Sequence, residues 1–155
     1  MHLIIKPCHY EYKEHCLSLF DLNSPDFFAP NERSDFSDFL NKADDSYLIV
    51  LLDGELVGCF GLSETGYERQ GRVSWIMADP NRHGQGIGRS MMDWIISRSI
   101  NLSIGELLIA ASHISEPFFA RFGAERIAYR ANGWGEGMHR VDMRLHIPAV
   151  TEAGA

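Results

Sequence analysis

The segment Asp79-Pro80-Asn81-Arg82-His83-Gly84-Gln85-Gly86-Ile87-Gly88-Arg89-Ser90 lies between an apolar run at residues 73–78 and a helical pattern at residues 87–100. Its three glycines, at every second position, disfavour both helix and strand and permit a tight turn with no Cβ over the backbone. A strand, such a turn and a helix together predict a helix N-terminus with unpaired N–H donors and a positive dipole end. Such a terminus binds anions, phosphate above all, and Arg82 and Arg89 add positive charge beside it.

Three familiar kinds of turn can be compared with this segment. An ordinary strand-to-helix connection needs one glycine to relieve steric crowding, whereas this turn has three in five residues. A P-loop requires a Lys-Ser or Lys-Thr pair after its last glycine, and here Arg89-Ser90 follows with the wrong spacing. A dinucleotide-binding Gly-x-Gly-x-x-Gly pattern that begins at Gly84 would place its third glycine at Arg89. The segment is therefore neither a P-loop nor a dinucleotide-binding turn.

Length and composition indicate one globular domain. The chain has 155 residues, of which 45% are hydrophobic and 23% are charged. Its net charge of −7 argues against nucleic acid as a general partner, because a phosphate backbone requires a basic surface. An acidic chain is compatible with an amine substrate, but acidity that serves solubility alone is the simpler interpretation.

Cysteine and histidine spacing predict no metal site. The cysteines Cys8, Cys16 and Cys59 are widely spaced, and the seven histidines show no metal-ligand pattern. The N-terminal residues show no basic segment followed by a long apolar one, and no apolar run approaches about 20 residues. We therefore expect a cytoplasmic protein with reduced thiols, no bound metal and no membrane partner.

Hydrophobic periodicity predicts the element order β-α-α-β-β-β-α-β-α-β-β, with the glycine turn before the third helix. Asp53-Gly54 between two apolar runs predicts a hairpin, and Asn31 and Ser115 are expected to cap helices. Gly123 is expected to end the short fourth helix, and residues 132–137 to form a glycine-rich connection. The remaining boundaries are strands at residues 3–5, 47–52, 56–62, 73–78, 107–111, 125–130 and 141–147, and helices at residues 10–22, 31–41 and 87–100.

Two segments resemble motifs of the GCN5-related N-acetyltransferases, the GNAT family. The turn His83-Gly84-Gln85-Gly86-Ile87-Gly88, with Pro80 before it, is similar to motif A, although His83 stands where arginine or glutamine is usual. The segment Pro117-Phe118-Phe119-Ala120-Arg121-Phe122-Gly123-Ala124 resembles motif B, in which an aromatic pair precedes a glycine at the end of a short helix. The element order matches over nearly the whole chain. The resemblance implies an α/β fold with a mixed sheet, in a single N-acetyltransferase domain at residues 1–147 before a loose tail at residues 148–155.

The resemblance implies that acetyl-CoA binds where the strand at residues 73–78 splays from the strand at residues 107–111. Its pyrophosphate is expected on the glycine turn, and its pantetheine arm beside the backbone of residues 76–78. A backbone N–H of Met77 or Ala78 is expected to stabilise the oxyanion when a primary amine of a small molecule, protein or peptide attacks the thioester directly. The residues expected at the cofactor are Ile76, Met77, Ala78, His83, Gly84, Gln85, Gly86, Ile87, Gly88, Arg89, Ser112 and Phe119.

Two positions depart from the family pattern. Phe119 stands where a tyrosine often gives a proton to the leaving thiolate, and Ser112-His113 stand where an asparagine is frequent. His113 is a candidate acid, base or adenine contact, or else a turn histidine in water. Glu64 is a candidate base beside the acceptor cleft, acting through water, or else a surface glutamate. The absent tyrosine motivates an alternative function, a non-catalytic acyl-CoA-binding sensor or regulatory module.

Four further residues are candidates for the acceptor side. Phe27 and Phe28 are expected either to roof the acceptor pocket or to pack between the first two helices. Trp134 is expected to line the acceptor pocket or to pack on the sheet rim, and Asp142 to face the acceptor or solvent. The expected partners are acetyl-CoA and an amine acceptor, without nucleic acid or membrane, and a homodimer is a further option.

Overall fold

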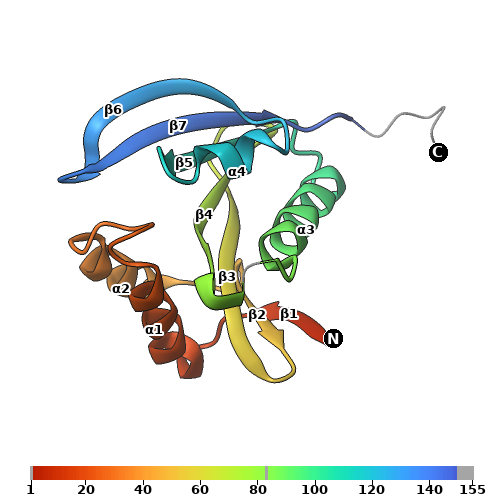
Figure 1. The fold of residues 1–155 in the computed structure, drawn as a ribbon. Coiled ribbons are helices and arrows are strands. Elements are labelled where there is room, and N and C mark those ends of the chain that lie inside the picture. The colour runs from red at the N-terminus through yellow and green to blue at the C-terminus, as the bar shows by residue number, and fades with distance from the viewer. Residues whose placement is uncertain (1, 83, 150–155) are drawn as a thin grey trace.

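A seven-stranded mixed sheet carries helices on both faces in the computed structural model, which describes residues 2–82 and 84–149 (Figure 1). The strands lie in the order β1-β2-β3-β4-β5-β7-β6. Their bounds are β1 (Leu3–Pro7), β2 (Tyr47–Leu52), β3 (Glu55–Glu64), β4 (Gln70–Ala78), β5 (Glu106–Ser112), β6 (Glu125–Gly135) and β7 (Met138–His146). The helices are α1 (Lys13–Asn23), α2 (Glu32–Lys42), α3 (Ile87–Asn101) and α4 (Glu116–Ala120), with 3-10 turns at Tyr10–Tyr12 and Pro80–Arg82.

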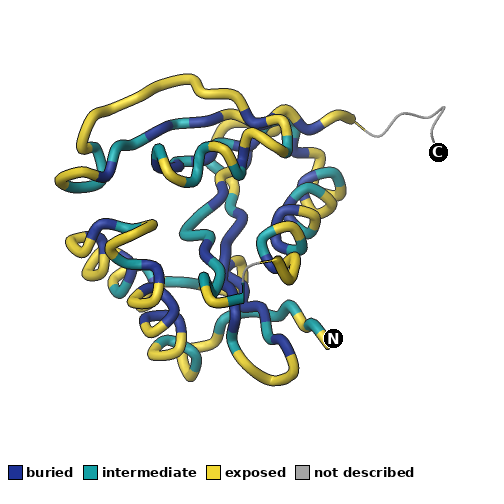
Figure 2. The backbone as a smooth tube through the Cα atoms, viewed as in Figure 1, coloured by how far each residue is buried: buried dark blue, intermediate teal, exposed yellow. Residues whose placement is uncertain are grey.

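The strand β2 shows how the two faces of the sheet are used. Leu48 and Val50 pack in one hydrophobic cluster with α3 and α4, whereas Tyr47 and Ile49 pack in a second cluster with α1 and α2. This division follows from the alternation of side chains along a strand. Buried backbone follows the central strands, while β6 is largely exposed (Figure 2). The pair α1 and α2 therefore covers one face and α3 the other.

The sheet opens between β4 and β5. These strands are parallel and pair over only four residues, Gln70–Val73 with Glu106–Ile109. Beyond them β4 continues beside β3, and β5 continues beside β7, so the two strands no longer meet. The splay that the resemblance implied is therefore present, and residues 74–78 of β4 have no strand partner on that side.

A bulge in β4 lies within this unpaired part. The register against β3 shifts between Cys59 and Gly61, and Trp75 on the opposite strand has a φ of 43°. A bulge bends its strand and redirects side chains. The Trp75 ring accordingly turns toward α2, where its centroid lies 5.0 Å from that of Phe36. The hydroxyl of Tyr47 donates a 2.7 Å hydrogen bond to the Trp75 carbonyl and fixes the bulge.

The predicted element order is confirmed, and several details differ. The Asp53-Gly54 hairpin has left-handed backbone at both residues, and Gly123 follows α4 with a φ of 101°. Asn31 and Ser115 precede helices but make no side-chain cap, because their backbone is already helical instead of extended. The expected connection at residues 132–137 belongs largely to β6 and its turn into β7.

Residues 150–155 of the expected tail lie outside the described residues. Within the described ranges, no helix is long and apolar enough to cross a membrane.

Candidate active site

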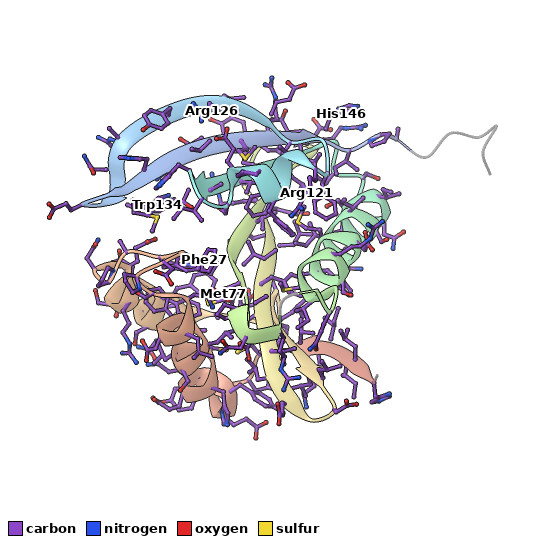
Figure 3. The ribbon with its side chains drawn as sticks, viewed as in Figure 1. Phe27, Met77, Arg121, Arg126, Trp134 and His146 are labelled. Atoms are coloured by element: carbon purple, nitrogen blue, oxygen red, sulfur yellow. The ribbon has the colours of Figure 1, made fainter. Side chains whose placement is uncertain are left out.

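A cavity of about 850 Å³ occupies the opening between β4 and β5. Its size is typical of a ligand site. Figure 3 shows Phe27, Met77, Trp134 and Arg121 around this opening, each from a different element. The wall is built from the end of α1, the α1–α2 loop, α2, β4, the glycine turn with α3, β5, α4 and Trp134 of β6.

The glycine turn forms an open anion cradle at one end of the cavity. Gly84 and Gly86 have φ values of 84° and 76°, and a Cβ on either would meet nothing within 4 Å. Gly86 is the N-cap of α3, and Ser90 N–H donates to its carbonyl at 2.9 Å. The three N–H groups before Ser90 belong to the first helical turn, where the helix supplies no acceptors. Left-handed backbone, empty space and unpaired donors together fit a phosphate group.

Gly88 has a different purpose from the other two glycines of the turn. A Cβ at Gly88 would lie 3.0 Å from the Phe118 ring, so the missing side chain lets α4 approach α3 closely. This contact holds the two helices that flank the cradle at a fixed separation.

Three arginines line the cavity near the cradle. Arg82 pairs with Glu55 and lies 3.7 Å from a carboxylate oxygen of Asp79, so its charge is partly neutralised. The Arg89 side chain is 80% exposed and makes a long contact, 3.9 Å, with the Asp93 carboxylate. Arg121 stacks over the Phe118 ring and lines the cavity. Arg89 and Arg121 are therefore the cations best able to reorient toward an anionic ligand.

The backbone of Ala78 points an N–H toward the opening. Asp79 N–H donates to the Val57 carbonyl of β3 at 2.8 Å. Successive strand residues direct their N–H and C=O groups to opposite sides of the strand. The N–H and C=O of Ala78 therefore point away from β3, and those of Met77 point toward it. The Ala78 carbonyl indeed accepts a 3.0 Å hydrogen bond from the Asn23 side chain. Of the two candidates for an oxyanion donor, Ala78 has the better orientation.

Asn23 fixes this part of β4 to the end of α1. Its side-chain amide donates to the carbonyls of Leu19 and Ala78, at 2.9 and 3.0 Å, and the residue is buried. It also lines the cavity. The carbonyl of Ala78 is thus satisfied without a neighbouring strand, which leaves its N–H as the donor available to a ligand.

Phe119 closes the cavity from α4. Only 3% of it is exposed, and its ring belongs to the main hydrophobic cluster while also facing the cavity. Ser112 lies beside it at the end of β5, where its hydroxyl accepts the N–H groups of Ile114 and Ser115. The hydroxyl of Ser112 is therefore occupied in shaping the turn.

Aromatic side chains line the end of the cavity opposite the cradle. They come from the α1–α2 loop, α2, β4 and β6, and comprise Phe27, Phe28, Phe39, Trp75 and Trp134. Three contacts hold Trp134. Its Nε1 donates a hydrogen bond to the Ala111 carbonyl at 2.8 Å, and the Arg140 guanidinium stacks on its ring. Its own carbonyl accepts a hydrogen bond from the Asn31 side-chain amide. Trp134 therefore both lines the cavity and packs on the sheet.

Phe28 likewise has both of its expected positions. It lines the cavity, and its ring centroid lies 5.3 Å from that of Phe20 on α1. Phe27 is 41% exposed at the cavity mouth. The loop thus contributes one ring to the core and one to the entrance.

Glu32 is a buried carboxylate at this site, and no local sequence pattern marks it. It lines the cavity with 4% of its surface exposed, and Oε2 accepts a 2.8 Å hydrogen bond from Ala29 N–H. Burial raises the pKa of Glu32 to about 7, against the lowering effect of the Ala29 bond, and the charge of Asp35 adds to the rise. Among the described residues every buried side-chain polar atom has a partner. Oε1, for which the described residues supply no partner, is therefore open to the cavity.

The structure brings most of the predicted site residues together. Those that line the cavity are Ile76, Met77, Ala78, Gly84, Gly86, Ile87, Gly88, Arg89, Ser112, Phe119, Phe27, Phe28 and Trp134. Gln85 lies in the turn between Gly84 and Gly86 but does not line the cavity. His83 lies outside the described residues.

Three candidate residues lie outside the cavity, which agrees with the alternative expected for each of them, a surface or turn position. Glu64 is at the far end of β3 and lines a separate hollow of about 620 Å³ beside α3. His113 turns out of β5 and packs on His139, whose N–H donates to His113 Nδ1 at 3.2 Å. Asp142 pairs with Arg140 at 2.9 Å instead of facing the cavity.

Sequence reasoning missed several lining residues for a common reason. Glu32 is an ordinary acidic residue in the first turn of a helix, and Asn23 is an ordinary polar residue at the end of one. Phe39 is an ordinary apolar residue of a helix. Their role arises from tertiary contact with β4, for which local pattern carries no signal.

The fold is similar to those of solved acetyltransferases. A protein from Desulfovibrio desulfuricans described as a GNAT-family acetyltransferase superposes with a TM-score of 0.76 at 17% identity, over 95% of this chain and 100% of its own. An N-acetyltransferase from Staphylococcus aureus superposes with a TM-score of 0.70 at 13% identity, over 96% of this chain and 100% of its own. N-acetylglutamate synthase from Neisseria gonorrhoeae was solved with coenzyme A and N-acetyl-glutamate. It superposes with a TM-score of 0.73 at 16% identity, over 96% of this chain and 36% of its own. At these identities the likenesses show the fold alone.

No curated protein sequence matches the chain. The model of the acetyltransferase (GNAT) family, however, matches residues 16–124. That range begins in α1, contains the glycine turn and the β4–β5 opening, and ends just beyond α4. The chain therefore belongs to the GNAT family of acetyltransferases.

Proposed function

We propose that the protein transfers an acetyl group from acetyl-CoA to a primary amine by direct attack of the amine on the thioester. The observation that carries this proposal is the continuity of one cavity from the open glycine cradle, past the unpaired part of β4, to an aromatic end. A phosphate site, an extended backbone edge and a separate apolar compartment are what the two substrates need.

The cradle and the arginines would hold the phosphates of the thioester substrate. The N–H groups at the start of α3 supply donors, and Arg89 and Arg121 supply charge. The unpaired edge of β4 gives the pantetheine amides a strand to pair with. These contacts bring the acetyl group to the level of Ala78.

Ala78 N–H would then stabilise the negative charge that develops on the thioester oxygen. Its direction is set by the Asp79–Val57 and Asn23–Ala78 hydrogen bonds, so no reorganisation accompanies the reaction. The remaining contribution is proximity, because both reactants enter one enclosed space.

Phe119 cannot give a proton to the departing sulfur. An ordinary thiol has a pKa near 8.5. The thiolate of CoA is therefore an adequate leaving group close to neutral pH. The buried phenyl ring instead excludes water beside the thioester. We therefore expect turnover without an acid on α4.

Thiol release from acetyl-CoA, measured with a panel of primary amines, tests the function. The proposal predicts amine-dependent release and an acetylated amine in equal amounts, detected by mass spectrometry. Tight binding of acetyl-CoA by calorimetry with no release for any amine would favour the alternative, an acyl-CoA-binding sensor. No binding of CoA would contradict both.

A further inference from the structure

We propose that Glu32 takes the proton of the incoming amine, and that the acceptor is a small apolar primary amine with no carboxylate beside its nitrogen. This inference rests on the proposed function and names the substrate class of the same site. It is carried by a buried carboxylate with one open oxygen, set among aromatic side chains at the end of the cavity away from the phosphate cradle.

The position of Glu32 is fixed from two sides. Ala29 N–H holds Oε2, and the same loop is fastened to β6 through the Asn31–Trp134 bond. The fit is close, because a Cβ on Gly135 would fall 2.3 Å from Asn31 Oδ1 and 2.8 Å from the Ala29 Cβ. Glu32 therefore begins α2 directly after the loop that is fastened to β6, and both Glu32 and Trp134 line the cavity.

A buried carboxylate is costly unless it meets a positive charge or a proton. Among the described residues no cation forms an ion pair with Glu32. Asp35, exposed on the same helix, is a charged neighbour, and the other charged residues that line the cavity are Arg72, Asp79, Arg82, Arg89 and Arg121. Beyond Trp134, Arg140 is already paired with Asp142. An acceptor ammonium group would give the ionised Glu32 the positive partner that no ion pair among the described residues supplies.

The rest of the acceptor end selects an apolar body. Five aromatic side chains surround the space, and π faces favour both rings and the cationic head of an amine. A carboxylate next to the nitrogen would be forced close to Glu32, and like charges in a buried site repel strongly. An amine such as 2-phenylethylamine satisfies these conditions, whereas an α-amino acid does not.

The proton and electron pairs balance without any further reactant. Glu32 takes one proton from the ammonium, and the freed nitrogen lone pair forms the C–N bond with the thioester carbonyl carbon. The C–S bond breaks, and its electron pair leaves with sulfur as the CoA thiolate. A second nitrogen proton reaches the thiolate through water, and Glu32 returns its proton to solvent. The products are the amide, the CoA thiol and one proton.

The substitution Glu32→Gln tests the role of the carboxylate. Glutamine has nearly the same volume and can still accept from Ala29 N–H, so the fold should persist, which the melting temperature verifies. We expect kcat/KM for 2-phenylethylamine at pH 7.5 to fall about 100-fold or more, the scale of a positioned acid–base group. Asp38→Asn, an exposed change of equal charge on the same helix, is the matched control and should stay within twofold.

The pH profile separates a proton acceptor from a structural group. Wild-type kcat/KM should rise to a plateau once the carboxylate is ionised, above about pH 7. In Glu32→Gln it should instead rise about tenfold per pH unit toward the pKa of the amine near 10, because only neutral amine then reacts. Identical profiles for the two proteins would overturn the role of Glu32.

An acceptor panel tests the substrate class. We expect 2-phenylethylamine to exceed phenylalanine in kcat/KM by at least 100-fold, and that ratio to shrink in Glu32→Gln. Equal rates for the two, or a preference for peptide N-termini over small amines, would overturn the class. Calorimetry of CoA with Glu32→Gln distinguishes the two levels of the account: unchanged affinity with unchanged kinetics would remove this inference alone, and absent CoA binding in the wild type would remove the proposed function.

Discussion

The side-chain amide of Asn31 donates a 2.8 Å hydrogen bond to the carbonyl oxygen of Trp134, 103 residues further along the chain. This bond joins the α1–α2 loop to the end of β6, two segments that otherwise belong to opposite halves of the molecule (Figure 1). Because both segments line the same cavity, the bond sets the shape of its aromatic end, where we propose that the acceptor binds.

Asn31→Ala should therefore loosen the acceptor end and leave the cradle alone. A single hydrogen bond contributes about 1 kcal/mol, so we expect the acceptor KM to rise about fivefold with an unchanged KM for acetyl-CoA. Asn41→Ala, at the other end of α2, is the control. Equal effects of both substitutions would show that the Asn31–Trp134 bond has no special part in acceptor binding.

Trp134→Ala should have a larger effect of the same kind. It removes an aromatic wall, the bond to the Ala111 carbonyl and the stacking of Arg140. We expect the acceptor KM to rise by about tenfold or more while the Kd of CoA, measured by calorimetry, stays within twofold. A change confined to CoA affinity would show that the Trp134 indole contacts CoA and not the acceptor.

His113→Ala should hardly change turnover. The ring lies outside the cavity, and its Nδ1 is occupied by the N–H of His139. Loss of that bond should cost about 1 kcal/mol of stability, whereas kcat should stay within twofold and its pH profile should show no loss of activity above pH 8. A drop of about 100-fold, with a descending limb at high pH, would restore His113 as an acid.

The raised pKa of Glu32 should also appear in stability. Its pKa is about 7 in the folded protein against a reference value of 4.5. Between these two values the folded state holds a proton that the unfolded state has released. The resulting contribution to the free energy of unfolding is fully present below pH 4.5 and is lost as pH rises through about 7. Relative to Glu32→Gln, the wild type should lose on the order of 3 kcal/mol of unfolding free energy between pH 4.5 and 8. A constant difference in urea titrations would show that Glu32 titrates normally.

The sequence predicts the fold well because its signals are local. The hairpin at Asp53-Gly54 follows from left-handed turn chemistry, and the cradle at Gly84 and Gly86 follows from the same preference before a helix. The β4–β5 splay, by contrast, was implied by the resemblance to the GNAT family and by no local pattern. For β6 the glycines at residues 133 and 135 suggested a connection, but close approach of Arg140 and Asn31 is the actual reason for them.

The acceptor side could not be predicted in the same way. Glu32 and Asn23 become site residues because α1 and α2 dock against the far end of β4, a contact that no local pattern encodes. Glu64 lies outside the cavity for the converse reason. It is on the strand next to β4, but strand β3 carries it to the opposite end of the pair, where Glu64 lies across from Gly71.

The most direct test of the central claim is the affinity of Gly86→Glu for CoA. The substitution places a side chain and a negative charge in the empty space of the cradle, at a left-handed position. Gly66→Glu is the matched control, because Gly66 also has a left-handed φ, 92°, with open space around it, in the turn between β3 and β4. By calorimetry we predict a loss of at least 100-fold in CoA affinity, about 2.7 kcal/mol, for Gly86→Glu and none for Gly66→Glu. Unchanged affinity in a folded Gly86→Glu protein would contradict the claim that the glycine turn binds the cofactor.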